Sequence, residues 1–489
     1  MIPLSLAEIA AVVGGRLHDA NATSIVTGPV EFDSRKLGPG GLFVAVPGER
    51  VDGHDFAADA IRAGAVAVLA AREVHAPAVI VPPVESHGSR AYALAGDTDG
   101  AGAAVLAGLG ALARCVVDRL VPGGLTVVGV TGSSGKTSTK DLIASLLARL
   151  GPTVAPPGSF NNELGHPWTV LRADQQTRHL VLELSARAPG HIAALCRVAP
   201  PRIGAVLNVG SAHLGEFGSR AGIAKTKGEL VEALPSDGVA VLNVDDPLVA
   251  AMADRTDARV VFVGESERAR VRAVDVTVDE QVRPRFRLVT PAGDAEVRLA
   301  VHGAHQVGNA LTAAAVALEL GMPVAEVARG LAEAAPVSRR RMEVTTRQDG
   351  VTVINDAYNA NPESMRAALQ ALAALGNQGN QSRTWAVLGP MGELGEDSVA
   401  RHDEIGRLAV RLDINRLVVV GAQAAPMHRG AHLEGSWGEE SVLVPDVDAA
   451  IALLRAQVRP GDAVLVKASN VFSLWQVADA LLEPVGDHA

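Results

Sequence analysis

The fold of this chain is decided by the stretch Thr126-Val127-Val128-Gly129-Val130-Thr131-Gly132-Ser133-Ser134-Gly135-Lys136-Thr137. Thr126 to Val130 has the β-branched composition of a buried strand, and Thr131 to Thr137 is a glycine-rich turn. Beyond the turn, apolar residues recur at the spacing of one helix face until Gly151 and Pro152, where a helix would stop. These apolar residues are Leu142, Ile143, Leu146, Leu147 and Leu150. The sequence therefore predicts a strand, a turn and a helix in direct succession.

A strand, turn and helix of this kind form a phosphate site, because backbone N–H groups and the helix dipole point at phosphate oxygens. Lys136 would reach the terminal phosphates, and Thr137 would hold Mg²⁺. The strict P-loop pattern has Gly where Val130 stands, so this turn is a shortened variant. A Gly-Ser turn that only leads into an α/β helix is the alternative. We predict that a nucleoside triphosphate contacts Thr131, Gly132, Ser133, Ser134, Gly135, Lys136, Thr137 and Ser138.

The composition indicates a multidomain α/β protein and argues against a nucleic-acid partner. A length of 489 residues corresponds to roughly three domains. Only 3% of the residues are aromatic, the net charge is −10, and no basic run exceeds Arg339-Arg340-Arg341. Such a chain offers little surface for base stacking or for phosphate backbones.

The sequence also predicts a cytoplasmic location without membrane insertion. Cys115 and Cys196 lack metal-ligand spacing, which favours a reducing compartment. The N-terminus has no basic region, and Ser5-Leu6-Ala7-Glu8 is typical of a capping box that opens a helix rather than of a signal peptide. The longest uncharged run, Leu299 to Leu318, contains several polar residues, so no transmembrane span is predicted.

The strand and turn pattern predicts three α/β domains. Residues 1–100 contain short strands between Gly/Pro turns, residues 101–336 alternate strands and helices around the P-loop, and residues 337–489 predict a second, Rossmann-like doubly wound sheet. Ala95 to Gly110, rich in Gly, Ala and Asp, is predicted to be a linker. Val271 to Leu299 often alternates Val with charged residues, which predicts an antiparallel excursion from the central parallel sheet.

Three further candidates lie at or beyond the ends of predicted central strands, where open α/β sheets place ligands. Glu183 closes a strand, His213 follows the strand that ends at Asn208, and Lys225 lies in the first turns of a predicted helix. A carboxylate and an imidazole beside a P-loop can ligate Mg²⁺. The alternatives are a capping carboxylate, a packed loop histidine and a solvated lysine, and spacing alone does not choose between them.

The series of motifs resembles the Mur ligase family of ATP-dependent amide-forming enzymes in peptidoglycan precursor synthesis. The resemblance covers nearly the whole chain. Its strings include Asp33-Ser34-Arg35, Asp52-Gly53-His54-Asp55-Phe56, Ser159-Phe160-Asn161-Asn162-Glu163, Ala212-His213-Leu214, Ala224 to Glu229, Gly303 to Ala310, Arg341-Met342-Glu343, Asn355-Asp356-Ala357-Tyr358-Asn359-Ala360-Asn361-Pro362, Leu388 to Gly395 and Val466-Lys467-Ala468-Ser469. The branch most similar to this chain adds D-alanyl-D-alanine to UDP-N-acetylmuramoyl-tripeptide.

The resemblance implies ATP, two Mg²⁺ ions and a modified lysine. Lys136 would hold the β- and γ-phosphates, and Thr137 with Glu183 would hold one Mg²⁺. His213 would join the second Mg²⁺, and Lys225, carbamylated by CO₂, would give that ion an anionic oxygen ligand. Three residues would contact the nucleotide: Asn309 the adenine, Asp356 the ribose and Arg341 the transferring phosphoryl group.

The resemblance also implies where the other substrates bind. Asp33, Ser34 and Arg35 would hold the uridine diphosphate in the N-terminal domain. The muramyl peptide would pass Asn161 and Asn162. The dipeptide would bind in the C-terminal domain, near Tyr358, Asn359, Asn361, Lys467 and Ser469. The chain is expected to act as a monomer that closes about hinges between its domains.

Two departures and two alternatives remain open. Pro390 stands where the family usually has Asp, and Asn470 where it usually has a basic residue, so details of the dipeptide contact are in question. A sibling ligase that adds a diamino acid would be expected to show an Asp-Asn-Pro-Arg-type loop, which is absent here. A P-loop protein that uses ATP as a switch, without ligation, is the alternative from another class.

Overall fold

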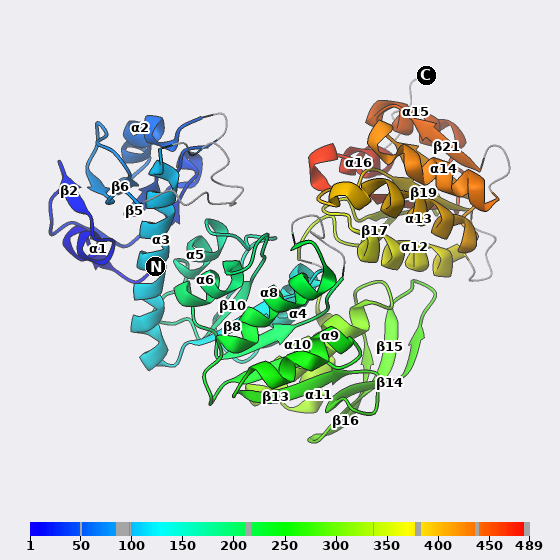
Figure 1. The fold of residues 1–489 in the computed structure, drawn as a ribbon, viewed down its shortest axis with the longest axis horizontal. Coiled ribbons are helices and arrows are strands. Elements are labelled where there is room, and N and C mark those ends of the chain that lie inside the picture. The colour runs from blue at the N-terminus through cyan, green and yellow to red at the C-terminus, as the bar shows by residue number, and fades with distance from the viewer. Residues whose placement is uncertain are drawn as a thin grey trace.

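The computed structural model consists of three α/β units, with the central unit between the other two (Figure 1). The structure describes residues 1–48, 51–84, 97, 99–210, 217–335, 337–376, 383–435 and 440–483. The predicted fold class is confirmed, since each unit is built on its own sheet with parallel strands. The domain boundaries at residues 100/101 and 336/337 stay predictions.

The N-terminal unit is a five-stranded sheet in the order β2-β7-β6-β5-β4. Its strands are β2 (Arg16–His18), β4 (Val30–Glu31), β5 (Gly41–Val44), β6 (Ala65–Ala70) and β7 (Ala78–Ile80). All neighbours pair in parallel except β2, which is an antiparallel edge. Helix α1 (Leu6–Val12) opens with the predicted capping box of Ser5 and Glu8, and α2 (Ala57–Arg62) packs on β6.

The central unit is a nine-stranded sheet in the order β16-β15-β14-β13-β12-β11-β8-β10-β9. Its strands are β8 (Thr126–Thr131), β9 (Thr153–Val154), β10 (His179–Glu183), β11 (Ile203–Val206), β12 (Val239–Asn243), β13 (Arg259–Gly264), β14 (Val271–Val278), β15 (Pro284–Thr290) and β16 (Gly293–Arg298). β8 to β14 pair in parallel, whereas β14, β15 and β16 pair antiparallel, so the predicted excursion is confirmed.

Helices cover both faces of the central sheet. One core contains α4 (Lys136–Leu147), α10 (Gln306–Glu319) and α11 (Val324–Glu333). The other contains α5 (Gly165–Val170), α6 (His191–Val198) and α8 (Arg220–Glu232). Because β8 and its parallel neighbours are buried on both sides, their sequences are continuous runs of apolar residues.

The predicted linker from Ala95 to Gly110 is wrong for residues 101–110, which are helical. Ala101–Leu120 is a single helix, α3, and the carboxylate of Asp97 accepts hydrogen bonds from the backbone N–H groups of Gly102 and Ala103 in its first turn. The small residues that suggested a linker serve close packing instead. A Cβ on Gly108 would lie 2.7 Å from a methyl group of Val81, so only glycine lets α3 approach the N-terminal sheet this closely.

The C-terminal unit is a six-stranded sheet in the order β17-β18-β22-β19-β20-β21. Its strands are β17 (Glu343–Thr346), β18 (Thr352–Asn355), β19 (Thr384–Leu388), β20 (Arg416–Val420), β21 (Ser441–Val444) and β22 (Ala463–Lys467). α12 (Pro362–Gly376), α13 (Ser398–Arg411) and α14 (Ala425–Glu434) share one core, and α15 (Val447–Gln457) and α16 (Trp475–Leu482) share another. β17 is an antiparallel edge, and the remaining strands are parallel, as a doubly wound sheet requires.

Among the described helices, none is both long and apolar enough to span a membrane.

Candidate active site

A cleft of about 1030 Å³ between the central and C-terminal units brings most of the predicted site residues together. Those that line it are Ser133, Ser134, Gly135, Lys136, Thr137, Ser138, Asn161, Asn162, Glu183, Asn309, Arg341, Asp356, Tyr358, Asn359, Asn361, Lys467 and Ser469. The carboxyl ends of β8, β10 and β11 open into this cleft, as expected for a parallel sheet.

The P-loop has the local geometry that its sequence predicts. Gly135 adopts a left-handed conformation with φ of 79°, and α4 begins at the next residue. A Cβ on Gly135 would lie 2.5 Å from Oδ1 of Asn309, so both the backbone angle and the space require glycine. Asn309 itself is buried, accepts a hydrogen bond from Thr139 and donates one to Gln306. The side chain of Asn309 therefore already forms hydrogen bonds beside the P-loop, and its predicted contact with adenine would have to replace or share them.

Lys136 folds back over the P-loop, where its ammonium group donates a 2.8 Å hydrogen bond to the carbonyl of Gly132. Burial lowers the pKa of Lys136, and the charge of Arg341 lowers it further, whereas Glu183 raises it. The lysine thus lies where a phosphate could bind it in exchange for a backbone carbonyl.

Asn208, at the end of the segment that follows β11, was missed by the sequence analysis. Its Oδ1 accepts hydrogen bonds of 3.0 Å from the backbone N–H groups of both Ser133 and Ser134, and its Nδ2 donates to the carbonyl of Ser134. These two N–H groups are ones that a P-loop offers to phosphate. The side-chain oxygen of Asn208 thus occupies the place that a phosphate oxygen would take. The signal in the sequence was a polar residue just beyond β11, the strand beside β8.

Glu183 is a buried carboxylate held by neutral donors. Its Oε2 accepts a 2.8 Å hydrogen bond from the hydroxyl of Thr137, and its Oε1 accepts one of 2.8 Å from Nδ2 of Asn161. The hydroxyl of Ser159 lies 2.7 Å from that of Thr137. Buried carboxylates are normally paired with cations or metals, so this arrangement of hard oxygens fits a Mg²⁺ ion that also binds phosphate. Within the described ranges there is no cluster of three His, Cys, Asp or Glu residues.

The structure places Lys225 away from the cleft. Its side chain is exposed on α8, and its backbone carbonyl accepts a hydrogen bond from Arg255. Lys227 instead is buried, and its ammonium group has no hydrogen-bond or carboxylate partner among the described residues. Two residues apart on a helix face nearly opposite directions, because each residue turns the helix by about 100°. The predicted carbamate on Lys225 therefore does not fit its position.

Burial lowers the pKa of Lys227 well below its usual range, and the positive charge of Lys136 lowers it further. Lys227 is thus the lysine of α8 whose side chain is affected by the charge of the P-loop lysine. His213, the remaining predicted metal ligand, lies outside the described residues.

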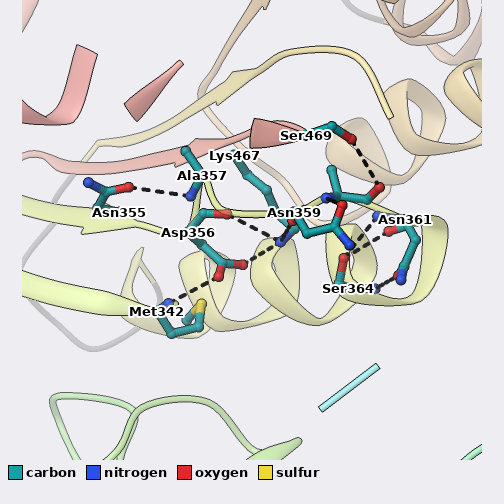
Figure 2. Close-up of polar contacts among 10 residues, drawn as sticks. Met342, Asn355, Asp356, Ala357, Asn359, Asn361, Ser364, Lys467 and Ser469 are labelled. Atoms are coloured by element: carbon teal, nitrogen blue, oxygen red, sulfur yellow. Dashed lines mark hydrogen bonds and ion pairs between the residues drawn. The ribbon is translucent and has the colours of Figure 1, made fainter. Parts of the chain in front are cut away.

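Lys467, predicted to bind the dipeptide, is engaged inside the C-terminal unit (Figure 2). Its ammonium group lies 2.5 Å from Oδ2 of Asp356 and 2.9 Å from the carbonyl of Asn359, with the carbonyl of Asp356 at 3.4 Å. The side chain of Lys467 is only 2% exposed. The other carboxylate oxygen of Asp356 accepts a hydrogen bond from the backbone N–H of Met342.

Asn361 caps α12, the alternative that the sequence analysis kept open. Its Oδ1 accepts a 2.8 Å hydrogen bond from the backbone N–H of Ser364, and the hydroxyl of Ser364 bonds back to the backbone of Asn361 (Figure 2). Its Nδ2 also points to the carbonyl of Ser133, 3.5 Å away in the P-loop. Ser469 accepts a hydrogen bond from the backbone of Gly392. The start of α12 thus contacts the P-loop.

Arg341 joins the two sides of the cleft. Its guanidinium lies 4.3 Å from the ring centre of Tyr358 and donates a 2.5 Å hydrogen bond to Ser159. Through Ser159 it connects to Thr137 and Glu183. A second link between the units is the ion pair of Arg187 and Glu393, at 2.8 Å.

The remaining predicted residues lie apart from the cleft or serve local structure. Asp33 caps a short 3₁₀ turn and pairs with the largely exposed Arg35, and Ser34 begins that turn, so all three belong to the N-terminal unit. Thr131 donates its hydroxyl to the carbonyl of Leu184. Asn162 lines the cleft but also caps the turn before α5 through the N–H of Gly165.

Three family models match this chain in succession. They describe a Mur ligase family catalytic domain over residues 29–95, a Mur ligase middle domain over residues 130–317 and a Mur ligase glutamate ligase domain over residues 340–470.

Two curated relatives that match nearly the whole chain share one name. The chain is 61% identical to the UDP-N-acetylmuramoyl-tripeptide--D-alanyl-D-alanine ligase of Mycobacterium tuberculosis, over 99% of this chain and 98% of the relative. The protein of that name from Escherichia coli is 34% identical, over 99% of both chains. Among solved structures, MurF from Acinetobacter baumannii matches with a TM-score of 0.84 and 29% identity over 99% of both chains. MurF ligase from Thermotoga maritima in complex with ADP matches with a TM-score of 0.77 and 30% identity, over 95% of this chain and 99% of that one.

Proposed function

This chain belongs to the Mur ligase family, and we propose that it is the ATP-dependent ligase that joins D-alanyl-D-alanine to UDP-N-acetylmuramoyl-tripeptide. The observation that carries the proposal is the cleft itself. It places a P-loop lysine, a buried carboxylate and the Asn359 to Asn361 loop of a second domain around one space, in a chain that matches ligases of this name from end to end.

The chemistry requires that the acceptor carboxylate be activated, because an oxide ion is a poor leaving group. Transfer of the γ-phosphoryl group of ATP to the carboxylate gives ADP and an acyl phosphate. The amine of the dipeptide then attacks the acyl carbon, phosphate leaves, and the amine loses a proton to complete the amide. In such steps the protein contributes mainly positioning and charge stabilisation. Lys136, on the P-loop, and Arg341, 2.5 Å from Ser159, supply positive charge on the two sides of the cleft.

We propose that Thr137 and Glu183 hold one Mg²⁺ ion. The hydroxyl of Thr137 and the carboxylate of Glu183 are hard oxygen ligands, and their mutual hydrogen bond of 2.8 Å brings them within reach of one ion. Bound there, Mg²⁺ would neutralise charge on the phosphate oxygens. His213 stays a proposed ligand of a second ion.

We assign the carbamate to Lys227 in place of Lys225. A buried ammonium beside another ammonium is unfavourable, and the depressed pKa of Lys227 favours the neutral amine. A neutral amine can add to CO₂, releasing one proton and leaving an anionic carbamate. That group would turn an unfavourable cation into an oxygen ligand and offset the charge of Lys136.

The remaining assignments are proposals on the same basis. Asn309 contacts the adenine, and Asp356 contacts the ribose. Asp33, Ser34 and Arg35 hold the uridine diphosphate, and Asn161 and Asn162 line the path of the muramyl peptide. Tyr358, Asn359, Asn361 and Ser469 shape the space for the dipeptide. A monomer in the cytoplasm stays the expectation for the whole chain.

The test measures release of phosphate and ADP with each substrate omitted in turn. Phosphate release should require ATP, the nucleotide-tripeptide and D-alanyl-D-alanine together. ATP hydrolysis that ignores the dipeptide would favour the switch protein, and dependence on a diamino acid would favour the sibling ligase.

The matched pair Lys227→Ala and Lys225→Ala tests the metal side of the proposal. Lys227→Ala should be nearly inactive and partly restored by added short carboxylic acids, whereas Lys225→Ala should keep nearly full turnover. The reverse result would return the carbamate to Lys225.

A further inference from the structure

We propose that Arg366, on the second turn of α12, binds the carboxylate of the incoming dipeptide and selects substrates that carry a free C-terminal carboxylate. The inference rests on the proposed function and assigns a specificity-determining residue to it. The dipeptide must present its amine to the acyl phosphate, so its carboxylate needs a separate positive group at the other end.

Lys467 cannot supply that group as the cleft stands. An ammonium group has three donors, and those of Lys467 face Asp356 Oδ2, the carbonyl of Asn359 and the carbonyl of Asp356. Contact with a substrate carboxylate would break the ion pair with Asp356 and leave that carboxylate, whose side chain is only 14% exposed, without its cation. Lys467 therefore acts as a positioning residue for the Asp356 to Asn359 segment.

The other cations of the cleft have partners within the protein as well. Lys136 binds the Gly132 carbonyl, Arg187 pairs with Glu393, Arg220 binds the Val209 carbonyl, Arg341 binds Ser159, and Arg401 pairs with Glu404 and Asp397. Among the Lys and Arg residues described in the cleft, Arg366 alone has no hydrogen bond or ion pair to the described protein, and its side chain is exposed to the cleft. A guanidinium group in this state can form a bidentate contact with a carboxylate.

The position of Arg366 suits the length of a dipeptide. The first residues of α12 adjoin the central unit, since Asn361 Nδ2 lies 3.5 Å from the Ser133 carbonyl and a Cβ on Gly210 would lie 2.6 Å from the Glu363 carboxyl carbon. Arg366 lies five residues beyond Asn361, which is roughly 7.5 Å along the helix axis at 1.5 Å per helical residue. Two extended residues span roughly 7 Å. An extended dipeptide is therefore long enough to place its amine near the P-loop and its carboxylate at Arg366.

One face of α12 forms part of the cleft wall and is accessible to substrate. Glu363, Ser364, Arg366 and Ala367 all line the cleft, at the spacing of neighbouring turns of one helix. Asn470, which also lines it, is uncharged. Arg366 is thus the positive group that remains for an anionic end of the substrate in this part of the cleft.

The experiment compares D-alanyl-D-alanine with its C-terminal amide in the full-length enzyme, with saturating ATP and nucleotide-tripeptide. Arg366→Ala should lower kcat/KM for the dipeptide by roughly 10- to 100-fold, mainly through KM, because a charge-assisted hydrogen bond is lost. The rate with the amide should change by less than about twofold. The wild-type preference for the free carboxylate should therefore collapse, while KM for ATP and for the nucleotide-tripeptide stays constant.

Two further variants define the outcome. Arg366→Lys should keep an intermediate preference, since the charge remains but the bidentate geometry is lost. Arg429→Ala is the matched control: Arg429 is an exposed arginine on α14, away from the cleft, and the variant should behave as wild type. A wild-type enzyme that does not ligate the dipeptide at all would overturn the proposed function and this inference together. An active wild type whose preference for the carboxylate survives in both Arg366 variants would overturn this inference alone.

Discussion

The two junctions of the central unit are built in different ways. Toward the N-terminal unit the contact is a large, continuous apolar core. Toward the C-terminal unit, hydrogen bonds and an ion pair surround the cleft, and the apolar contact among the described residues is limited to Val278 and Val282, which pack on the C-terminal core. The difference indicates which part of the chain is fixed and which part can move.

The N-terminal junction shares one hydrophobic core with the central unit. The same cluster of buried residues runs from Ile2 through α3 to Ala258. Three aromatic rings meet at the boundary: Phe32, Phe160 and Trp168, with ring centres 4.7 to 6.3 Å apart. The chain has only 14 aromatic residues (4 Trp, 2 Tyr and 8 Phe), so three in one contact indicate a concentrated source of stability. We infer that these two units move as one body.

The C-terminal junction has a strained connection instead. Arg340 and Met342 adopt left-handed conformations, with φ of 60° and 50°, which are uncommon for residues with side chains. Arg341 between them reaches Ser159 across the cleft. Polar contacts of this kind can be remade with water at small cost. The C-terminal unit is therefore the one expected to open for substrate exchange and to close for reaction. Substitutions at the polar junction should reduce activity, and substitutions at the apolar junction should reduce stability.

The largest effect is expected for Lys136→Ala, on the cleft side. Loss of the charge aimed at the terminal phosphates should reduce kcat by roughly a thousandfold or more, about 4 kcal/mol of transition-state stabilisation. The free energy of unfolding should change little, since among the residues that the structure describes the one hydrogen bond of the Lys136 side chain goes to the Gly132 carbonyl. Steady-state kinetics and chemical denaturation check the two parts. Near-normal turnover would refute the P-loop assignment.

The next effect is expected at the apolar junction. Trp168 is 7% exposed, and Trp168→Ala should reduce the free energy of unfolding by about 3 kcal/mol, because its ring leaves a cavity between Phe32 and Phe160. The matched aromatic control is Tyr358→Ala in the cleft, which should lower activity with a smaller loss of stability. Urea denaturation of both variants decides the comparison. Equal losses of stability would mean that the two junctions are alike.

The sequence predicted the strands that form this architecture better than it predicted the contacts between them. Continuous apolar runs and the P-loop located β8 and α4, because local composition determines buried parallel strands. The helix α3 was missed because its glycines permit close packing as well as flexibility. A linker and a Gly-rich packed helix share one composition.

Most of the predicted site residues line one cleft, but the sequence did not indicate how they pair. Sequence order places Lys467 and Asp356 111 residues apart, and nothing local indicates that they form an ion pair. Lys225 and Lys227 differ only in which face of α8 they occupy, and the two-residue spacing of the motif does not fix that face. The contact of Asn208 with the P-loop could be recognised only from the pairing of β11 with β8 in the structure.

Acid should reduce the stability of the protein through a buried histidine in α5. His166 in α5 is fully buried, and burial lowers the pKa of its imidazole to about 4, although the carbonyls of Leu195 and Glu183 favour the charged form. In the unfolded chain the pKa is near 6.5. Between pH 6.5 and 4 the unfolded chain therefore binds the proton first, so stability is lost as the pH falls.

The loss due to His166 should total on the order of 3 kcal/mol at pH 4. His166→Leu removes the titrating group, so its free energy of unfolding should depend less on pH across this window than that of the wild type. Denaturation at several pH values measures the difference. Parallel pH profiles for the two proteins would show that His166 is not the group that senses acid.

The smallest effect is expected for the ion pair between Arg187 and Glu393, which crosses the polar junction. Their side chains are 34% and 39% exposed, so water screens the 2.8 Å contact, and each side chain loses rotamer freedom when the pair forms. A double-mutant cycle with Arg187→Ala, Glu393→Ala and the double variant should give a coupling free energy of about 0.2 to 1 kcal/mol in kcat/KM for ATP.

The coupling should shrink when ionic strength rises, because an exposed pair is screened by salt. A coupling above roughly 2 kcal/mol that salt does not alter would instead describe a desolvated, permanent contact. In that case the C-terminal unit would be held as firmly as the N-terminal one, and opening would have to come from elsewhere in the chain.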